Sequence, residues 1–246
     1  MTKVLATYNI KGGVGKTSAA VNLSYLAAHG GSRTLLWDLD PQGASTYLFR
    51  VKPRVRGGGR KLVRLKSDPA ELIKGTDYRL LDLLPADFSY RHMDLALDHV
   101  NPAKRRIAGV LEPLRPDYDY IFLDCPPSIS LVSESVFLTA DALLVPIIPA
   151  MLSARTFEQL TALVKGPHVL AFFSMVEVRK SHHRQVMARL RAVYGFTMLG
   201  AAIPAADEVE RMGIERDVVA AFAPRSQAAV AYEALWLDVR RRLTRL

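Results

Sequence analysis

The stretch NIKGGVGKTS, residues 9–18, constrains this chain more than any other feature of its sequence. The common phosphate-binding loop follows G-x-x-x-x-G-K-[S/T], and Gly15, Lys16 and Thr17 match the end of that pattern. Its first glycine should be residue 10, which is Ile10, and an additional lysine, Lys11, comes next. The stretch therefore predicts a phosphate-binding loop with an unusual second lysine.

The surroundings of the loop suit a bound triphosphate. KVLATYNI predicts a strand before the loop, and KTSAAVNLSYLAAHG predicts a helix after it. Glycines let backbone N–H groups turn toward phosphate oxygens. The helix N-terminus adds unpaired N–H groups and a favourable dipole. In such a loop Lys16 would bridge the β- and γ-phosphates, and the Thr17 hydroxyl would ligate Mg²⁺.

Short apolar runs alternate with amphipathic stretches along the whole chain. Strands without polar alternation are those that helices cover on both faces. The pattern predicts an α/β fold, a doubly wound, mostly parallel sheet with helices on both faces. With no internal repeat and no long linker, we expect residues 1–246 to form a single domain. The expected strands are 3–10, 33–40, 78–86, 118–127, 142–150, 169–178 and 196–204, and the expected helices are 16–29, 130–139, 154–164, 183–194 and 226–242.

Two further motifs place acids where predicted strands end. LLWDLDPQG carries Asp38 and Asp40, and YDYIFLDCPPS ends its apolar run in Asp124. Ligands of doubly wound sheets bind at the carboxyl ends of strands. An acid there can hold Mg²⁺, hold a water on Mg²⁺ or orient an attacking water. Asp38 and Asp40 taken alone fit turn formation as well.

Composition narrows the class of protein. Half of the residues are hydrophobic, which is enough to bury a sizeable core. The single cysteine, Cys125, excludes an intramolecular disulfide and fits a reducing compartment. The opening residues MTKVLATYNI lack the long apolar stretch of a signal peptide, and no apolar run is long enough to span a membrane. We expect a cytoplasmic protein.

In combination, KGGVGKT, DLDPQG and DCPPS resemble the deviant-Walker ATPases of the ParA/MinD type, and most of all the short ParA-like partitioning ATPases. The resemblance covers nearly the whole chain. It implies the P-loop NTPase type of fold, ATP and Mg²⁺ as cofactors, and weak ATP hydrolysis that a partner protein stimulates. In this family the signature lysine, here Lys11, reaches across a dimer to the partner's ATP, which makes dimerisation depend on ATP. Such proteins partition plasmids or chromosomes, or position cell machinery, at the nucleoid.

The resemblance also assigns roles to single residues. Asp40 matches the acid that positions the hydrolytic water, and we expect it to act in catalysis with Lys11 and Lys16. Mg²⁺ would be held by Thr17, Asp38 and Asp124. The phosphate cradle would consist of Gly12, Gly13, Val14, Gly15, Lys16, Thr17 and Ser18.

The predicted adenine region departs from the family pattern. After VLAFFS the family often has an Asn near the base, and this chain has Ser174 and Met175. Many relatives carry Arg after Ile-Pro, where this chain has Ala205. We expect the base to lie near Ser174, Met175, Ile203, Pro204 and Ala205.

The net charge of +9 suits an anionic partner. Residues 50–66 hold eight cations and no acid, and this stretch reads as an exposed loop or hairpin, either simply solvated or anion-binding. In ParA-type relatives the DNA surface comes mainly from the C-terminal half. The resemblance therefore favours sequence-independent DNA binding by an ATP-state homodimer through Arg179, Lys180, Arg184, Arg189, Arg191, Arg240, Arg241 and Arg242.

A MinD-like membrane-surface ATPase is the alternative. The last predicted helix carries Trp236 and Leu237 close to four arginines, a combination that suits anionic lipid. Leu235 and Val239 stand at helical spacing, which favours packing in the core instead. An iron–sulfur reductase on the same scaffold is excluded, because each subunit typically supplies two cysteine ligands and Cys125 is alone. The sequence does not fix the cargo or the stimulating partner.

Overall fold

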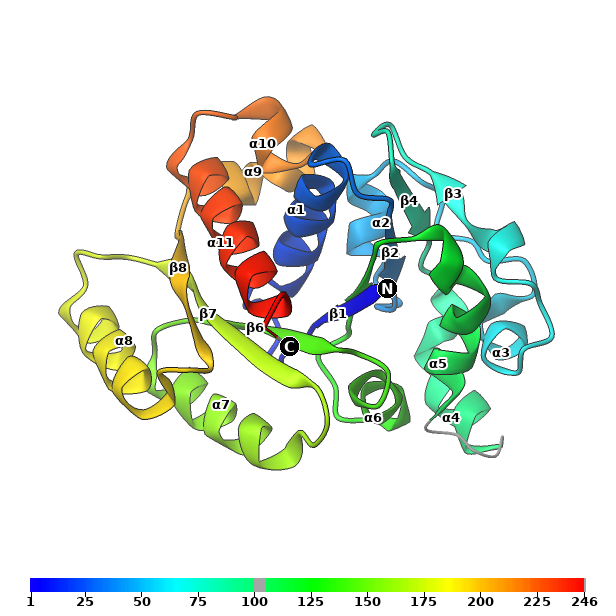
Figure 1. Cartoon of the computed structure of the whole chain (residues 1–246), viewed down its shortest axis with the longest axis horizontal. Coiled ribbons are helices and arrows are strands. Elements are labelled where there is room, and N and C mark those ends of the chain that lie inside the picture. The colour runs from blue at the N-terminus through cyan, green and yellow to red at the C-terminus, as the bar shows by residue number, and fades with distance from the viewer. Residues whose placement is uncertain (100–104, 246) are drawn as a thin grey trace.

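The computed structural model describes residues 1–99 and 105–245. At its centre lies an eight-stranded sheet with the order β3-β4-β2-β5-β1-β6-β7-β8 (Figure 1). Neighbouring strands are parallel except for β3 and β4, which are antiparallel. The strands are β1 (Lys3–Thr7), β2 (Thr34–Asp38), β3 (Lys74–Gly75), β4 (Leu81–Leu84), β5 (Tyr120–Asp124), β6 (Ala142–Ile147), β7 (His168–Val176) and β8 (Met198–Pro204).

Helices connect the parallel strands and cover the sheet (Figure 1). The longest are α1 (Lys16–His29), α7 (Met151–Leu163), α8 (Ser181–Tyr194) and α11 (Gln227–Leu243). The shorter ones are α2 (Ala44–Leu48), α3 (Gly58–Val63), α4 (Met93–Asp98), α5 (Arg106–Leu111), α6 (Leu131–Phe137), α9 (Asp207–Glu215) and α10 (Val219–Phe222), with 3₁₀ turns η1 (Ala70–Leu72), η2 (Phe88–His92) and η4 (Glu112–Asp117).

Two hydrophobic clusters lie on opposite faces of the sheet because strand side chains alternate in direction. In β1, Val4 and Ala6 belong to one cluster, which also holds buried residues of α3 to α8. Leu5 belongs to the other cluster, together with residues of α1, α9, α10 and α11. The helices α1 and α11 also contact each other on that face. The predicted doubly wound α/β class, with helices on both faces, is confirmed.

Strand register brings the sequence motifs together. Thr7 at the end of β1 pairs with Asp124 at the end of β5, and Asp38 at the end of β2 pairs with the same Asp124. The loops that follow β1, β2 and β5 therefore leave one edge of the sheet side by side. This edge is where a ligand of a doubly wound sheet is expected.

One expectation about residues 50–66 is wrong. The stretch is not a plain loop or hairpin, because residues 58–63 form the helix α3. Leu62 and Val63 of α3 and the preceding Val55 are buried, so the segment packs against the core. The cause is tertiary packing, which stabilises a helix that three consecutive glycines disfavour intrinsically.

The C-terminal helix α11 turns its apolar side toward the core. Leu235, Trp236 and Val239 are buried, while Leu237 is half exposed. This burial favours the core interpretation of the helix and removes Trp236 from any surface that would meet lipid. Among the residues that the structure describes, none of the helices has the length and apolar character that a membrane span requires.

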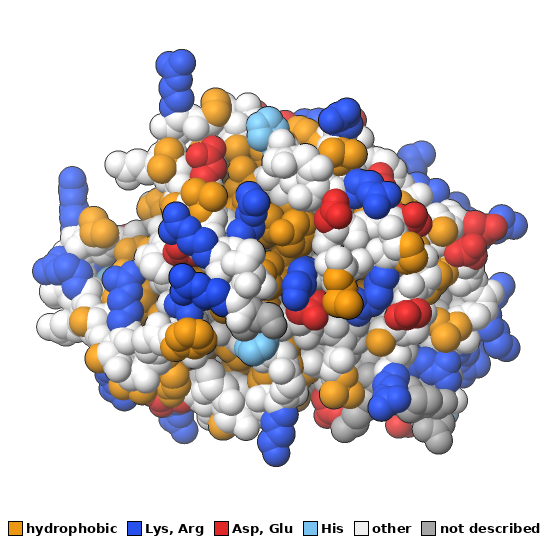
Figure 2. Space-filling model, viewed as in Figure 1, with side chains coloured by type: hydrophobic (Ala, Val, Ile, Leu, Met, Phe, Trp, Pro, Cys, Tyr) orange, Lys and Arg blue, Asp and Glu red, His pale blue; other side chains and the backbone are white. Residues whose placement is uncertain are grey.

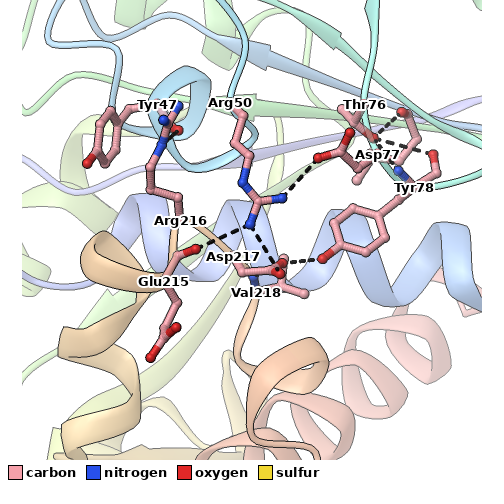
Figure 3. Close-up of polar contacts among 10 residues, drawn as sticks. Tyr47, Arg50, Thr76, Asp77, Tyr78, Glu215, Arg216, Asp217 and Val218 are labelled. Atoms are coloured by element: carbon pink, nitrogen blue, oxygen red, sulfur yellow. Dashed lines mark hydrogen bonds and ion pairs between the residues drawn. The ribbon is translucent and has the colours of Figure 1, made fainter.

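A polar junction ties the end of α2 to the loop after α9 (Figure 3). Arg50 follows α2 and donates hydrogen bonds to Asp77 and to the carbonyl of Glu215, 3.0 and 3.2 Å away. Its guanidinium also lies 3.6 Å from a carboxylate oxygen of Asp217, and the Tyr78 hydroxyl donates to that same carboxylate. The junction fixes Arg50, where the segment that runs from the end of β2 through α2 comes to its end.

Candidate nucleotide-binding site

The loop between β1 and α1 is anchored by a buried asparagine. Asn9 donates through Nδ2 to the carbonyl of Pro146 at 2.8 Å and accepts the backbone N–H of Lys11 through Oδ1 at 3.0 Å. Gly13 and Gly15 take the left-handed φ of 68° and 93°, which favours glycine. A Cβ on Gly12 or Gly13 would meet no atom within 4 Å. The loop is thus an open cradle bordered by backbone N–H groups.

Lys16 begins α1 and turns its side chain under the loop. Its Nζ donates to the carbonyl of Lys11 at 3.1 Å, and the residue is 7% exposed. Burial lowers the pKa of Lys16, while the nearby carboxylates of Asp124 and Asp40 act in the opposite direction. A buried ammonium short of counter-charge is suited to binding phosphate oxygens.

Lys11 has the opposite character. Its side chain is exposed, and its Nζ lies 3.5 Å from the hydroxyl of Ser153 in the first turn of α7. The two residues before Ser153, Met151 and Leu152, expose 58% and 73% of their surface. The second lysine therefore lies at the rim of the site beside exposed apolar side chains.

Asp124 ends β5 in full burial beside the start of α1. Its carboxylate accepts the Ser45 hydroxyl at 2.8 Å and the Thr7 hydroxyl at 3.3 Å. Burial raises the pKa of Asp124 above its ordinary value, and hydrogen bonds from Ser45 and Thr17 oppose that rise. A buried carboxylate in contact with the Thr17 hydroxyl fits the surroundings of a divalent cation, whose charge would offset the cost of burial.

Asp38, whose role in holding Mg²⁺ stays a prediction, also supports the loop that follows β2. One carboxylate oxygen accepts the N–H and the hydroxyl of Thr46 at 2.8 and 2.7 Å, and the other accepts the N–H of Asp40 at 3.2 Å. Asp38 is fully buried, and burial, followed by the charge of Asp124, raises its pKa. Because protein donors engage both oxygens, Asp38 holds the β2–α2 loop in place.

Asp40 is more accessible. It is half-buried, and one of its carboxylate oxygens accepts the N–H of Gln42 at 2.9 Å. Its carbonyl accepts the N–H of Gly43, so the loop makes a tight turn around it. The turn and the contact with Asp38 fix Asp40 near Lys16 and Asp124, whose pKa values its charge influences.

The residues predicted near adenine lie at the adjacent ends of β7 and β8. Val176 pairs with Pro204, and the N–H of Ala205 donates to Val176. Ser174 packs against the cradle, since a Cβ on Gly15 would come within 2.8 Å of its hydroxyl oxygen.

The exposure of these residues differs. Met175 is 37% exposed and takes a left-handed φ of 53°, while Pro204 is half-buried and Ala205 exposed. The side chain of Ile203 is 2% exposed and belongs to the core cluster under α1 and α11, which leaves its backbone to face a base. Base contact through all five residues stays a prediction.

Four residues of the site were not found from the sequence. Asn9, Ser45 and Ser153 contact the loop or its acids through partners far away in the chain, and Thr46 contacts Asp38, eight residues before it. Ser45 and Thr46 come two and three residues after DLDPQG, and this closeness is the signal that the sequence offers for them. Cys125 is buried and burial raises its pKa well above the ordinary value, so its thiol is not a nucleophile here.

The predicted DNA residues lie on two elements away from the phosphate loop. The first group comes just before α8 and along it, and the second occupies the last turn of α11. Basic side chains appear along both outer edges of the molecule, at α8 and at α3 (Figure 2). Positive surface is therefore found at α3 as well as at the C-terminal basic groups.

Comparison with known proteins places the chain in a family. A family model described as an AAA domain (AAA_31) matches residues 2–168. The sporulation initiation inhibitor protein Soj of Bacillus subtilis is 27% identical over 249 residues, covering 97% of this chain and 98% of its own length. The chromosome partitioning protein ParA of Caulobacter vibrioides is 30% identical over 214 residues, covering 82% and 80%.

Solved structures share the fold. Cobyrinic acid a,c-diamide synthase from Mycobacterium smegmatis, with bound ADP and magnesium, superimposes with a TM-score of 0.82 at 24% identity, over 99% of this chain and 96% of that one. A putative plasmid partition protein from Borrelia burgdorferi, bound to AMPPNP, gives 0.84 at 19% identity, over 98% and 100%. With its phosphate loop, its acidic strand ends and these relatives, the chain belongs to the AAA_31 family of AAA domains, among the ParA/MinD-type P-loop ATPases related to ParA and Soj.

Proposed function

We propose that this protein is an ATP-dependent dimerising switch that binds DNA without sequence specificity and partitions or positions a cargo. The observation that carries this proposal is the difference in burial between its two lysines. Lys16 is buried under its own loop, whereas Lys11 is exposed at the rim, available to a second copy. The cargo would be a plasmid, a chromosome or a protein assembly.

ATP and Mg²⁺ fit the cradle and the acids beside it. The N–H groups around Gly12 and Gly13, together with Lys16, would hold the phosphates, and Thr17 with Asp124 would hold the cation. Bound Mg²⁺ supplies charge neutralisation at the phosphates. Asp40 orients the attacking water, while Asp38 keeps the Asp40 turn in position through its hydrogen bond to the Asp40 N–H. Catalysis then rests on positioning and charge stabilisation.

The dimer face is the rim that carries Lys11. Met151 and Leu152 are adjacent exposed apolar side chains next to Ser153, which Lys11 contacts, and apolar side chains grouped at a rim suit an interface. A second copy would cover these side chains and receive Lys11 at its own nucleotide. Because Lys11 would find its anionic partner only when ATP is bound, the dimer depends on the nucleotide.

The net charge of +9 supports DNA as the anionic partner. Two copies in one dimer present each basic surface twice, which raises the affinity for a polyanion through multivalency. A partner protein would raise the weak basal hydrolysis and so release the dimer. The buried apolar side of α11 disfavours the alternative of a lipid-binding terminal helix.

The test is the oligomeric state with each nucleotide, measured by sedimentation. We expect Asp40→Ala, which blocks hydrolysis, to be dimeric with ATP and monomeric or weakly dimeric with ADP. Adding Lys11→Ala should abolish the ATP dimer while nucleotide binding persists. Lys165→Ala removes an exposed lysine beyond the end of α7 and serves as the matched control. A dimer that forms equally with both nucleotides, or that survives Lys11→Ala, contradicts the proposal.

A further inference from the structure

Seven basic side chains lie between residues 52 and 66, and the charge of one of them, Arg54, acts on the nearby carboxylate of Asp87. Within the described part of the chain, none of them forms an ion pair or a side-chain hydrogen bond. The buried Nε of Arg64 has no hydrogen-bond acceptor at all. We call this set the basic segment; its members are Lys52, Arg54, Arg56, Arg60, Lys61, Arg64 and Lys66.

The basic segment is nevertheless a folded scaffold. Val55, Leu62 and Val63 anchor it in the core, at 4%, 1% and 0% exposure. Gly59 lies so close to Tyr90 that a Cβ would come within 2.7 Å of the ring. Asp87 accepts the N–H of Val55 at 2.8 Å, so the nearest acid is engaged with the backbone. The cations are therefore displayed in place before any ligand arrives, which lowers the entropy cost of binding.

The C-terminal basic groups differ in this respect. Lys180, Arg189 and Arg241 form ion pairs with Glu177, Glu158 and Asp238. Three further arginines are engaged: Arg184 donates to the carbonyls of Val178 and Arg179, Arg191 to that of Gly200, and Arg242 stacks on Phe196. A phosphate at these six residues competes with an existing partner, whereas at the basic segment, as at Arg179 and Arg240, it meets a cation that forms no ion pair.

The surface around the basic segment is hollowed on two sides of α3. One cavity of about 920 Å³ is lined by four cations, Lys52, Arg54, Arg56 and Lys74, and by two acids, Glu71 and Asp87. A second of about 430 Å³ is lined by Arg60 and Arg64, with His92 and His99. The cations thus extend across α3 from one hollow to the other, a layout that suits a chain of phosphates better than a single small anion.

From this arrangement we propose that the basic segment, and not the C-terminal basic groups, is the main contact of this protein with the DNA phosphate backbone. The inference rests on the proposed DNA binding and assigns its surface. Among the large apolar side chains of residues 52–66, which carry the basic segment, only Leu65 is exposed, at 47%. This favours a polyanion in water over a lipid bilayer. Phe88 and Leu95 are also exposed nearby, so vesicles belong in the test.

The location also links this surface to the nucleotide. Gly43 ends the turn that holds Asp40, and a Cβ on Gly43 would lie 3.7 Å from Pro53 and 3.4 Å from Ala86. The basic segment therefore starts against the β2–α2 loop. A shift of that loop on ATP binding or hydrolysis would therefore move Lys52 and Arg54, which contact DNA in this proposal.

The test compares two variants that each remove three charges from exposed positions. The first is Arg54→Gln, Arg56→Gln and Arg60→Gln combined, and the second, its matched control, is Arg179→Gln, Arg240→Gln and Arg241→Gln combined. Binding to two unrelated DNA duplexes is measured against salt, with ATP and in the Asp40→Ala background. We expect the first variant to reduce the slope of log K against log salt by about 2.7 for each copy of the dimer that contacts the duplex, at about 0.9 for each lost phosphate contact, equally for both duplexes.

The control variant should leave the slope nearly unchanged. Unaltered ATP binding and thermal unfolding establish that each variant is folded. If the slope of log K against log salt falls in the control and is unchanged in the first variant, the assignment to the basic segment is wrong while DNA binding stands. If the unaltered protein binds anionic phosphatidylserine vesicles but no DNA, both the assignment and the proposed DNA binding fall.

Discussion

Asp38 and Asp40 stand two residues apart in one motif, and the structure gives them different surroundings. Asp38 is fully buried with both carboxylate oxygens engaged by protein donors, and Asp40 is half-buried with one oxygen engaged by Gln42. A buried, fully bonded carboxylate holds structure together, while an accessible one beside a phosphate loop can orient water. Substitutions at the two positions should therefore affect different properties.

The first prediction uses that contrast. Asp40→Ala should slow ATP hydrolysis by about 10²-fold, a typical loss for a group that acts on the reacting water, and leave ATP affinity and thermal stability nearly unchanged. Asp38→Asn should instead lower the free energy of unfolding by about 1–3 kcal/mol, because its amide N–H₂ cannot accept the donors that Thr46 and Asp40 supply. Phosphate release and urea unfolding measure the two effects. Hydrolysis at the normal rate in Asp40→Ala would show that another group positions the water.

We expect His183 to make the free energy of unfolding depend on pH. The residue is 5% exposed, and its Nδ1 accepts the N–H of Glu177 at 3.1 Å. Burial lowers its pKa, the charges of His182 and Lys180 add to the effect, and Glu177 opposes it. The unfolded chain thus takes up the proton more readily than the folded one. The stabilisation is complete above the unfolded pKa of about 6.5 and is lost as pH falls below that value.

We accordingly expect His183→Asn, whose Oδ1 can still accept the Glu177 N–H, to lose less stability than the unaltered protein between about pH 7 and about pH 5. The exposed neighbour provides the control, since His182→Asn removes only the smaller contribution of the His182 charge and should change the slope less than His183→Asn does. Urea unfolding at several pH values gives the slopes. Equal slopes for His183→Asn and the unaltered protein would remove His183 from this role.

At the scale of the element, α3 exists because of its packing. Gly59 faces Tyr90 and Met93, and a Cβ there would meet the Tyr90 ring at 2.7 Å. We predict that Gly59→Ala lowers the free energy of unfolding by about 1–3 kcal/mol through this overpacking. Gly75→Ala in β3 is the matched control, because its Cβ would meet nothing within 4 Å. Thermal and urea unfolding measure both; equal stability of the two variants would contradict the packing argument.

Elements with strong local signals were predictable. The expected helix 16–29 agrees with α1 at both ends, because a glycine loop precedes it and Gly30 follows it. By contrast, the glycines 57–59 and Pro53 suggested a loop where α3 forms, since no local pattern reports packing against Tyr90. The strand β3 has only two residues, too few for a periodic signal.

The same distinction applies to the site. Lys16, Thr17, Asp40 and Asp124 stand in motifs, and the sequence alone predicts that they lie together, although their roles stay predictions. Asn9 and Ser45 act through Pro146 and Asp124, which are 137 and 79 residues away, and only the sheet order brings these partners together. For Asp38 the role in holding Mg²⁺ stays a prediction, and the sequence pattern does not show that its oxygens also accept hydrogen bonds from Thr46 and Asp40.

At the scale of the whole molecule, the nucleotide loop, the basic segment and the α9 region form one packed unit. Asp38 and Gly43 connect the cradle to the start of the basic segment. Arg50 connects the same segment to Asp217 and Glu215 after α9 (Figure 3). Asn22 of α1 accepts the N–H of Val219 and so ties the helix that follows the cradle to the same region. A change at the nucleotide therefore has a continuous, well-packed route to the basic segment.

The last prediction follows from treating ATP and DNA as two ligands of one dimerising switch. If ATP raises the affinity for DNA by some factor, DNA must raise the affinity for ATP by the same factor, because binding free energies are linked. Asp40→Ala permits both measurements at equilibrium, since ATP is not consumed. We expect the two factors to agree, each about 5- to 150-fold, the usual range of coupling between sites. In Asp40→Ala combined with Lys11→Ala both factors should approach one, because without the dimer ATP no longer doubles the basic surface. Coupling that persists in this double variant would mean that ATP acts on the basic segment within a single chain, through the contact of Gly43 with Pro53, and not through dimerisation.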